Sequence, residues 1–197
     1  MIEQISAIVA QSIEVKQRYF AEHAADVVRA AELIAASFRA GGKVLLCGNG
    51  GSSTDAQHIA GEFVNQFSST PRRALPALAL STDGGVLTSI ANDTGFKQVF
   101  ARQVEAFGAQ GDVLVAITTS GTSKNIIAAV KLARKRGLKV IGLLGNKGGK
   151  VANLAKLCHL ALIVESTDTQ RIQETHSLVG HILCELVEQM LFAEDAV

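Results

Sequence analysis

Apolar and polar positions follow two different periods along this chain. Short apolar runs of strand length lie at residues 43–47, 77–80, 112–118, 139–144 and 159–164. They are nearly continuous in apolar residues, which is typical of strands that are buried on both faces of a parallel sheet. Between them, apolar residues recur at the three- and four-residue spacing of amphipathic helices. The alternation predicts a parallel sheet inside an α/β sandwich.

The helical segments predicted from this spacing begin with two amphipathic helices, over residues 2–13 and 27–38. Ser52 and Asp55 have the spacing of a capping box, so a helix is predicted to begin there. Residues 92–95 (NDTG) predict a turn. The other predicted helices cover residues 86–91, 96–107, 126 to about 137, a short segment after 149, and 172–191, where Ile172, Val179, Leu183, Leu186 and Met190 face inward.

Composition limits the class of protein. A chain of 197 residues fits one domain, and 48% hydrophobic with 19% charged residues indicates a globular protein without a membrane span. The formal net charge is +1, so no global field attracts nucleic acid or an anionic membrane. Cys47, Cys158 and Cys184 lie in apolar runs without a C-x-x-C pair, and residues 1–12 lack the features of a secretion signal. We therefore expect buried thiols and a reducing cytoplasm.

Small-residue loops follow three of the predicted strands, at residues 48–52 (GNGGS), 118–123 (TTSGTS) and 145–149 (GNKGG). All three fall at the carboxyl edge of the sheet, where open α/β folds bind ligands. The first two also lead into helix amino termini, whose free N–H groups and positive dipole end favour phosphate. No Lys follows the glycines as in a P-loop, and the third Gly of a dinucleotide fingerprint is missing. Helix capping alone would need only one of the hydroxyls, so an anion site is favoured.

Two polar clusters could carry chemistry. His58 and Glu62 are four residues apart on the polar face of one predicted helix, and Gln173 and His181 lie on the final helix. An exposed His–Glu pair is more often only solvated, and a histidine in an apolar stretch is more often a core residue. Together, the four could instead bind zinc through nitrogen and oxygen ligands. About 12 Å of helix rise separates Gln173 from His181, so one metal takes both only with extended side chains or at an interface between chains.

A resemblance to a known family rests on six segments in order: CGNGGS (47–52), DAQHIAGEF (55–63), ANDTGF (91–96), TTSGTSKNI (118–126), GNKGG (145–149) and RIQETHSLVGHIL (171–183). They resemble the sugar isomerase (SIS) domain and, more narrowly, the phosphoheptose isomerases. This resemblance implies a single SIS domain over residues 1–197: a three-layer, flavodoxin-like sandwich with a five-stranded parallel sheet over 41–197, and N-terminal helices over 1–40 at an oligomer interface. It also implies a cytoplasmic homotetramer with one zinc ion per subunit and active sites between subunits.

The same resemblance assigns residues when it is matched position by position. The implied zinc ligands are His58, Glu62, Gln173 and His181. Relatives often have Ser where this chain has Thr118, a change that keeps the hydroxyl. The implied contacts with a sugar phosphate are Asn49, Gly50, Gly51, Ser52, Glu62, Asn92, Asp93, Thr118, Thr119, Ser120, Ser123 and Gln173.

The implied reaction interconverts sedoheptulose 7-phosphate and D-glycero-D-manno-heptose 7-phosphate, the first step toward ADP-heptose for lipopolysaccharide. Such an aldose–ketose isomerisation moves a proton between adjacent carbons through an enediol, so it needs a base and an acid. We assign these roles to Glu62 and His181, with zinc as Lewis acid. One alternative is a non-catalytic SIS-fold tetramer that binds the replication initiator DnaA, which keeps the histidine without the carboxylate. Another is a sugar-phosphate-sensing module, which would not need the metal ligands.

Overall fold

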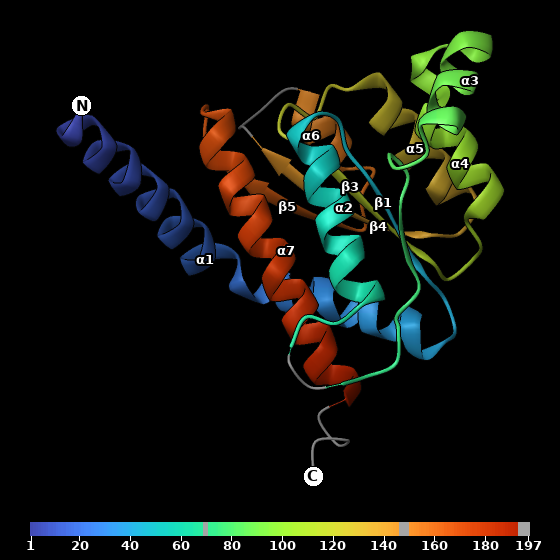
Figure 1. Cartoon of the computed structure of the whole chain (residues 1–197), viewed down its shortest axis with the longest axis horizontal. Helices are drawn as coiled ribbons and strands as arrows, with labels where there is room; N and C mark the ends of the chain where they lie inside the picture. Colours follow the sequence, from blue (N-terminus) through green and yellow to red (C-terminus); the bar gives the residue numbers. More distant parts are fainter. Residues whose placement is uncertain (69–70, 146–149, 193–197) are drawn as a thin grey trace.

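The computed structural model describes residues 1–68, 71–145 and 150–192 (Figure 1). It contains all five predicted strands: β1 (Val44–Cys47), β2 (Ala77–Ala79), β3 (Val113–Thr118), β4 (Lys139–Gly145) and β5 (Leu160–Val164). They form one parallel sheet in the order β2-β1-β3-β4-β5. This is the flavodoxin-like order, and the predicted fold class is confirmed. The order reverses at β1, which places the point where such folds bind ligands between β1 and β3.

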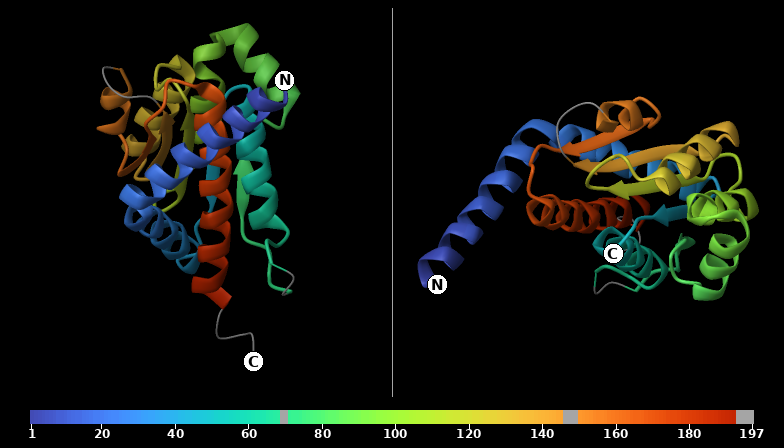
Figure 2. Two further views of the ribbon diagram at one scale, coloured as in Figure 1. Left: turned by 90° about the vertical axis from the view of Figure 1, so that its left-hand side faces the viewer. Right: turned by 90° about the horizontal axis from the view of Figure 1, so that it is seen from above.

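Helices cover both faces of the sheet (Figure 2). One face packs on α1 (Ile2–Arg39), α2 (Gly51–Val64) and α7 (Thr169–Phe192) through alternate strand residues such as Val115 and Ile117. The other face packs on α4 (Val99–Phe107) and α5 (Lys124–Lys135) through the intervening residues, such as Leu114 and Ala116. The remaining helices are α3 (Gly84–Thr94), the short 3₁₀ helix η1 (Phe96–Gln98) and α6 (Lys150–Ala155).

The N-terminal segment differs from the predicted pair of helices. Residues 2–39 form one helix of 38 residues, although two were predicted. Residues 14–26 contain neither Gly nor Pro, so nothing in them breaks the helix. The axis changes direction part of the way along, and the N-terminal end projects from the rest of the chain (Figure 1). From Ile8 onward the helix contacts α7, because the carbonyl oxygen of Ile8 accepts a 2.8 Å hydrogen bond from Arg171. The second half packs in the core, where Val27, Ile34 and Phe38 are buried.

Two local predictions are also wrong. Residues 92–94 do not form a turn but the last turn of α3, which ends at Gly95 with a φ of +89°. Asp83 begins that helix by accepting a hydrogen bond of 2.9 Å from the N–H of Val86. The capping box is absent as well, because the N-cap of α2 is Gly50 and Asp55 instead bonds the hydroxyl of Ser177.

The final helix α7 faces the core as predicted. Ile172, Val179 and Leu183 are buried, and Leu186 and Met190 pack against the same core from its edge. The predicted loop at 145–149 lies outside the described residues beyond Gly145. In the described part of the chain, no helix is both long and apolar enough to cross a bilayer.

Candidate active site

The loops after β1 and β3 meet at the switch point of the sheet. The side-chain amides of Asn49 and Asn125 join them through two reciprocal hydrogen bonds, of 3.0 and 2.8 Å. Asn125 is buried, and its side-chain oxygen also accepts the N–H of Ile126 at 3.0 Å. The sequence analysis did not identify Asn125 as a site residue, although it lies in the segment TTSGTSKNI. The pair fixes one loop against the other.

The loop after β1 depends on its glycines. Gly48 lies against the backbone of Ser52, where a Cβ would come within 2.2 Å of the carbonyl oxygen, so no larger residue fits. Gly50 has a φ of +57°, which other residues rarely adopt. Ser52 is buried, whereas Gly50 and Gly51 are exposed at the start of α2. The two exposed glycines therefore offer an anion the amino end of that helix.

The loop after β3 presents hydroxyls at the start of α5. Thr118 is buried, and its hydroxyl accepts the N–H of Gly121 at 3.3 Å. The hydroxyls of Ser120 and Thr122 lie 3.1 Å apart. Ser123 is the N-cap of α5 and makes no side-chain capping bond. Because capping does not use Ser123, and Ser120 is exposed, both hydroxyls can bind an anion at this helix terminus.

Asn92 and Asp93 lie on α3, outside these two loops. Both are exposed on α3, and their side chains bond each other at 2.9 Å. The helix that carries them has no buried residue. Among the residues described, neither side chain has a hydrogen bond to the loops at 48–52 or 118–123.

A polar seam runs between α2 and α7, which lie side by side (Figures 1 and 2). At its upper end, the side-chain amide of Gln173 touches Gly51, where a Cβ would come within 2.4 Å of the amide nitrogen. One turn along, the hydroxyl of Ser177 donates a 2.7 Å hydrogen bond to Asp55. The seam therefore leads from the phosphate loops down the two helices, through Gly51, Asp55, His58 and Glu62 on α2 and Gln173, Ser177 and His181 on α7.

The lower part of the seam joins three of the four predicted zinc ligands. The Nε2 atom of His58 lies 3.0 Å from a carboxylate oxygen of Glu62 and 3.2 Å from the Nε2 atom of His181. Gln173 is two turns away and contacts Gly51 instead. Within the described ranges, no three His, Cys, Asp or Glu side chains already surround a common point, so His58 contacts two partners without enclosing a metal.

The donor types of these four side chains, which are two imidazoles, a carboxylate and an amide, suit a zinc ion. Neighbouring ligand atoms around a tetrahedral zinc lie about 3.3 Å apart, given metal–nitrogen bonds of about 2.0–2.1 Å. The two contacts of His58 have similar lengths. Asp55 adds a second carboxylate, whose pKa is raised mainly by burial, although Ser177 and the nearby histidines oppose that shift. Glu62 pairs with His58, and in the described part of the chain neither Asp55 nor Glu62 pairs with a Lys or Arg.

Other candidate groups lie outside the seam. His176 is fully buried and its Nε2 contacts the carbonyl oxygen of Leu144 at 3.0 Å. Burial raises the pKa of the Cys47 thiol to about 12 and that of Cys158 to about 11. Burial also raises the pKa of Cys184. The three thiols stay protonated near neutral pH, so they do not act as nucleophiles.

Comparisons with known proteins show the family to which the chain belongs. A model of the SIS domain family matches residues 8–145. A phosphoheptose isomerase of Thermodesulfovibrio yellowstonii is 52% identical over 182 residues, which cover 92% of this chain and 89% of the relative. A phosphoheptose isomerase of Aquifex aeolicus is 49% identical over 97% of this chain and 98% of its own length.

Solved structures show the same likeness. The phosphoheptose isomerase GmhA from Neisseria gonorrhoeae superposes with a TM-score of 0.87 at 44% identity, covering 95% of this chain and 98% of the other. A phosphoheptose isomerase from Francisella tularensis reaches a TM-score of 0.90 at 38% identity with the same coverage. The similarity therefore extends over nearly the whole chain.

Proposed function

We infer the chemistry of this site from one premise: the chain belongs to the SIS domain family, among its phosphoheptose isomerases. It is an isomerase that interconverts sedoheptulose 7-phosphate and D-glycero-D-manno-heptose 7-phosphate. The observation that carries this function in the structure is the contact of His58 with both Glu62 and His181, below two loops suited to phosphate.

The phosphate of the substrate binds where the two loops meet. The amino ends of α2 and α5 offer backbone N–H groups from Gly50 and Gly51 and hydroxyls from Ser120 and Ser123. The sugar then extends down the seam. From Gly51 to His58 the rise along α2 is about 10 Å, which matches the length of an extended seven-carbon sugar. The reacting carbons reach the histidines while the phosphate stays at the loops.

Glu62 and His181 move the protons. In the direction from ketose to aldose, Glu62 removes a proton from C1 while His181 protonates the oxygen on C2, which gives an enediol. The proton is then delivered to C2 and the hydroxyl of C1 loses its proton, which leaves an aldehyde at C1. No redox partner is needed, because one carbon is oxidised as its neighbour is reduced.

His58, Glu62, Gln173 and His181 would hold the zinc ion, with Glu62 acting as ligand and base at different moments. When bound, zinc would polarise the carbonyl and orient the substrate oxygens. The close contacts of His58 with Glu62 and His181 support this proposal. Gln173 and His181 can divide between the sites of two subunits if each site includes part of a second chain.

We propose that the protein is a homotetramer, because sites that are shared between subunits need more than one chain. Ile2 and Ile5 at the projecting N-terminal end of α1 are 82% and 61% exposed, and Ile8, Val9 and Ile13, also exposed, extend the apolar stripe. Such a stripe is typical of a surface that another subunit covers. A neighbouring chain would also bring Asn92 and Asp93 to the loops. A cytoplasmic location and a role in supplying heptose to lipopolysaccharide follow as proposals from the isomerase activity. DnaA binding is not favoured, since Glu62 is in place beside His58.

The direct test is turnover of sedoheptulose 7-phosphate by the purified protein, before and after chelation and with zinc added back. We expect the aldose product, loss of activity with chelator and recovery with zinc. Turnover that survives complete removal of metal would contradict the role of zinc but not that of Glu62. Absence of turnover in the metal-loaded protein would contradict the isomerase function.

A further inference from the structure

A buried ion pair lies beyond the lower end of the seam. The Nε atom of Arg72 donates to a carboxylate oxygen of Glu188 at 2.5 Å, and the two side chains are 3% and 9% exposed. Arg72 belongs to the segment between α2 and β2, and Glu188 is on α7. The two residues are 116 positions apart, and no motif of the sequence analysis includes either. The pair therefore links the two helices of the seam.

Arg72 binds the end of α2 that carries Glu62. Its guanidinium donates to the carbonyl oxygens of Glu62 and Phe63 at 2.8 and 3.0 Å. These carbonyls belong to the last turn of α2, which ends at Val64, and such carbonyls have no partner within their own helix. One side chain thus holds the backbone of Glu62 and pairs with α7 at the same time.

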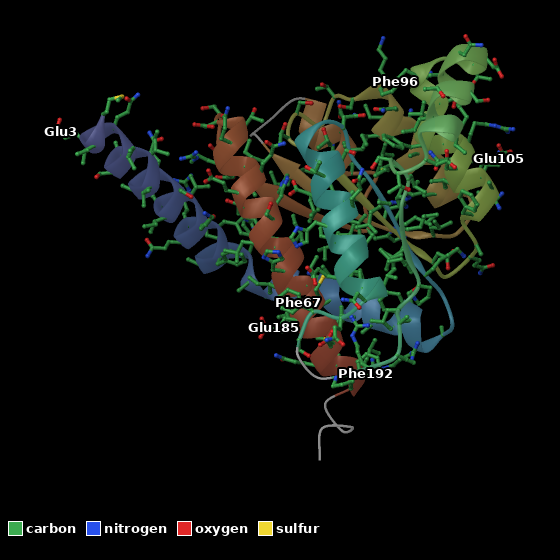
Figure 3. All side chains as sticks on the ribbon, viewed as in Figure 1. Glu3, Phe67, Phe96, Glu105, Glu185 and Phe192 are labelled. Carbon is green, nitrogen blue, oxygen red and sulfur yellow. The ribbon has the colours of Figure 1, made fainter. Side chains whose placement is uncertain are left out.

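Glu188 binds the segment that follows α2. Its carboxylate accepts the N–H groups of Phe67 and Ser68 at 3.1 and 3.0 Å, as well as the hydroxyl of Ser68. Burial alone would raise the pKa of Glu188, but these bonds and Arg72 lower it to about 2. The ring of Phe67 in turn lies 5.8 Å from that of His181, and Figure 3 shows Phe67 beside α7.

We propose that Arg72 and Glu188 are positioning residues for the isomerisation, which set the spacing between Glu62 on α2 and His181 on α7. The inference rests on the proposed roles of these two residues in proton transfer. A base and an acid must reach adjacent atoms of one substrate, and a displacement of about 1 Å can cost about a hundredfold in rate. Glu188 lies about 10 Å of helix rise along α7 from His181, so the pair would act on Glu62 and His181 through the helices that carry them.

The chain contains a matched ion pair far from the seam. The carboxylate of Asp112 is buried, pairs with Lys43 at 2.7 Å and accepts the N–H groups of Lys43 and Ala109 at 2.9 and 2.8 Å. It lies just before β3, at the opposite edge of the sheet from the phosphate loops. Removing its charge tests the structural cost of losing such a pair without touching α2 or α7.

The experiment measures kcat, KM and Tm for Glu188→Gln, Arg72→Lys and Asp112→Asn in the full-length, metal-loaded protein. Arg72→Lys keeps the positive charge but cannot reach Glu188 and both carbonyls at once, so it separates positioning from charge pairing. We expect kcat to fall about tenfold or more in both the Glu188→Gln and the Arg72→Lys variant, with KM changed less than about twofold. Asp112→Asn should lower Tm and leave kcat within about twofold of the wild type.

A wild-type kcat in Arg72→Lys, or an equal loss in Asp112→Asn, would overturn the inference. Should Glu188→Gln not fold, Arg72→Lys alone decides. Glu62→Gln, measured alongside, distinguishes the role of Glu62 as base from the positioning role of Arg72 and Glu188. Wild-type turnover in that variant would remove the proposed role of Glu62 as base, on which the inference rests, whereas its loss together with normal kinetics of the Arg72 and Glu188 variants would overturn only the positioning role.

Discussion

Replacing His176 by Gln should make the stability of the protein less sensitive to mild acid. His176 is fully buried on α7, and its Nε2 contacts the carbonyl oxygen of Leu144 at 3.0 Å. Its Nδ1 atom is buried without a partner in the described part of the chain. Burial lowers the pKa of His176 to about 4, although the bond to Leu144 opposes the shift. Gln can keep that bond through its amide but does not titrate.

The magnitude follows from linkage between protonation and folding. The unfolded chain binds a proton at His176 with a pKa of about 6.5, whereas the folded chain does so only near about 4. Between these values the unfolded state holds more protons, so stability is complete above pH ~6.5 and is lost as the pH falls toward ~4. At pH 5 this loss amounts to about 2 kcal/mol, and below pH ~4 to about 3 kcal/mol.

The assay is urea unfolding of the wild type and His176→Gln at pH 7.5 and pH 5, at one protein concentration because assembly affects apparent stability. The wild type should lose about 2 kcal/mol more free energy of unfolding between the two pH values than the variant does. Turnover of the variant at pH 7.5 should stay near wild type, since His176 lies outside the seam. Equal losses in the two proteins would refute a buried neutral imidazole as the cause.

Three further predictions concern the loops and the N-terminal helix. Replacing Ser120 and Ser123 together by Ala should raise KM for the sugar phosphate about tenfold or more, because charge-assisted hydrogen bonds are lost, and an unchanged KM would place the phosphate elsewhere. Asn125→Ala removes both bonds to the loop after β1 and should raise KM about tenfold; wild-type kinetics would show that the pair does not order the loops. Ile5→Glu with Ile8→Glu should give a smaller species in light scattering, and an unchanged mass would show that the stripe is not an interface.

Local patterns predicted the sheet well. The apolar runs of β1, β3 and β4 are continuous, as is typical of strands that are buried on both faces of a sheet. The small residues that follow these runs mark the carboxyl edge of the sheet. The turn predicted at 92–95 failed because Asn and Asp also fit the last turn of a helix that Gly95 ends. The capping box failed because Gly50 begins α2 and the packing of α7 gives Asp55 another partner.

Contacts between distant residues were beyond local patterns. Asn49 and Asn125 are 76 positions apart in the sequence, and Arg72 and Glu188 are 116 positions apart. No spacing within one segment encodes such pairs. His58 and Glu62 were identifiable because helical geometry places them together, but their contact with His181 required the packing of α2 on α7.

The most direct test of the account is the turnover of Glu62→Gln with sedoheptulose 7-phosphate. The amide is nearly isosteric, so the fold and much of the substrate binding should remain while the base is lost. We expect kcat to fall roughly 10²–10⁴-fold with KM little changed, as is typical when general-base catalysis is removed. A Glu62→Gln protein with wild-type kcat would contradict the assignment of Glu62 as the base.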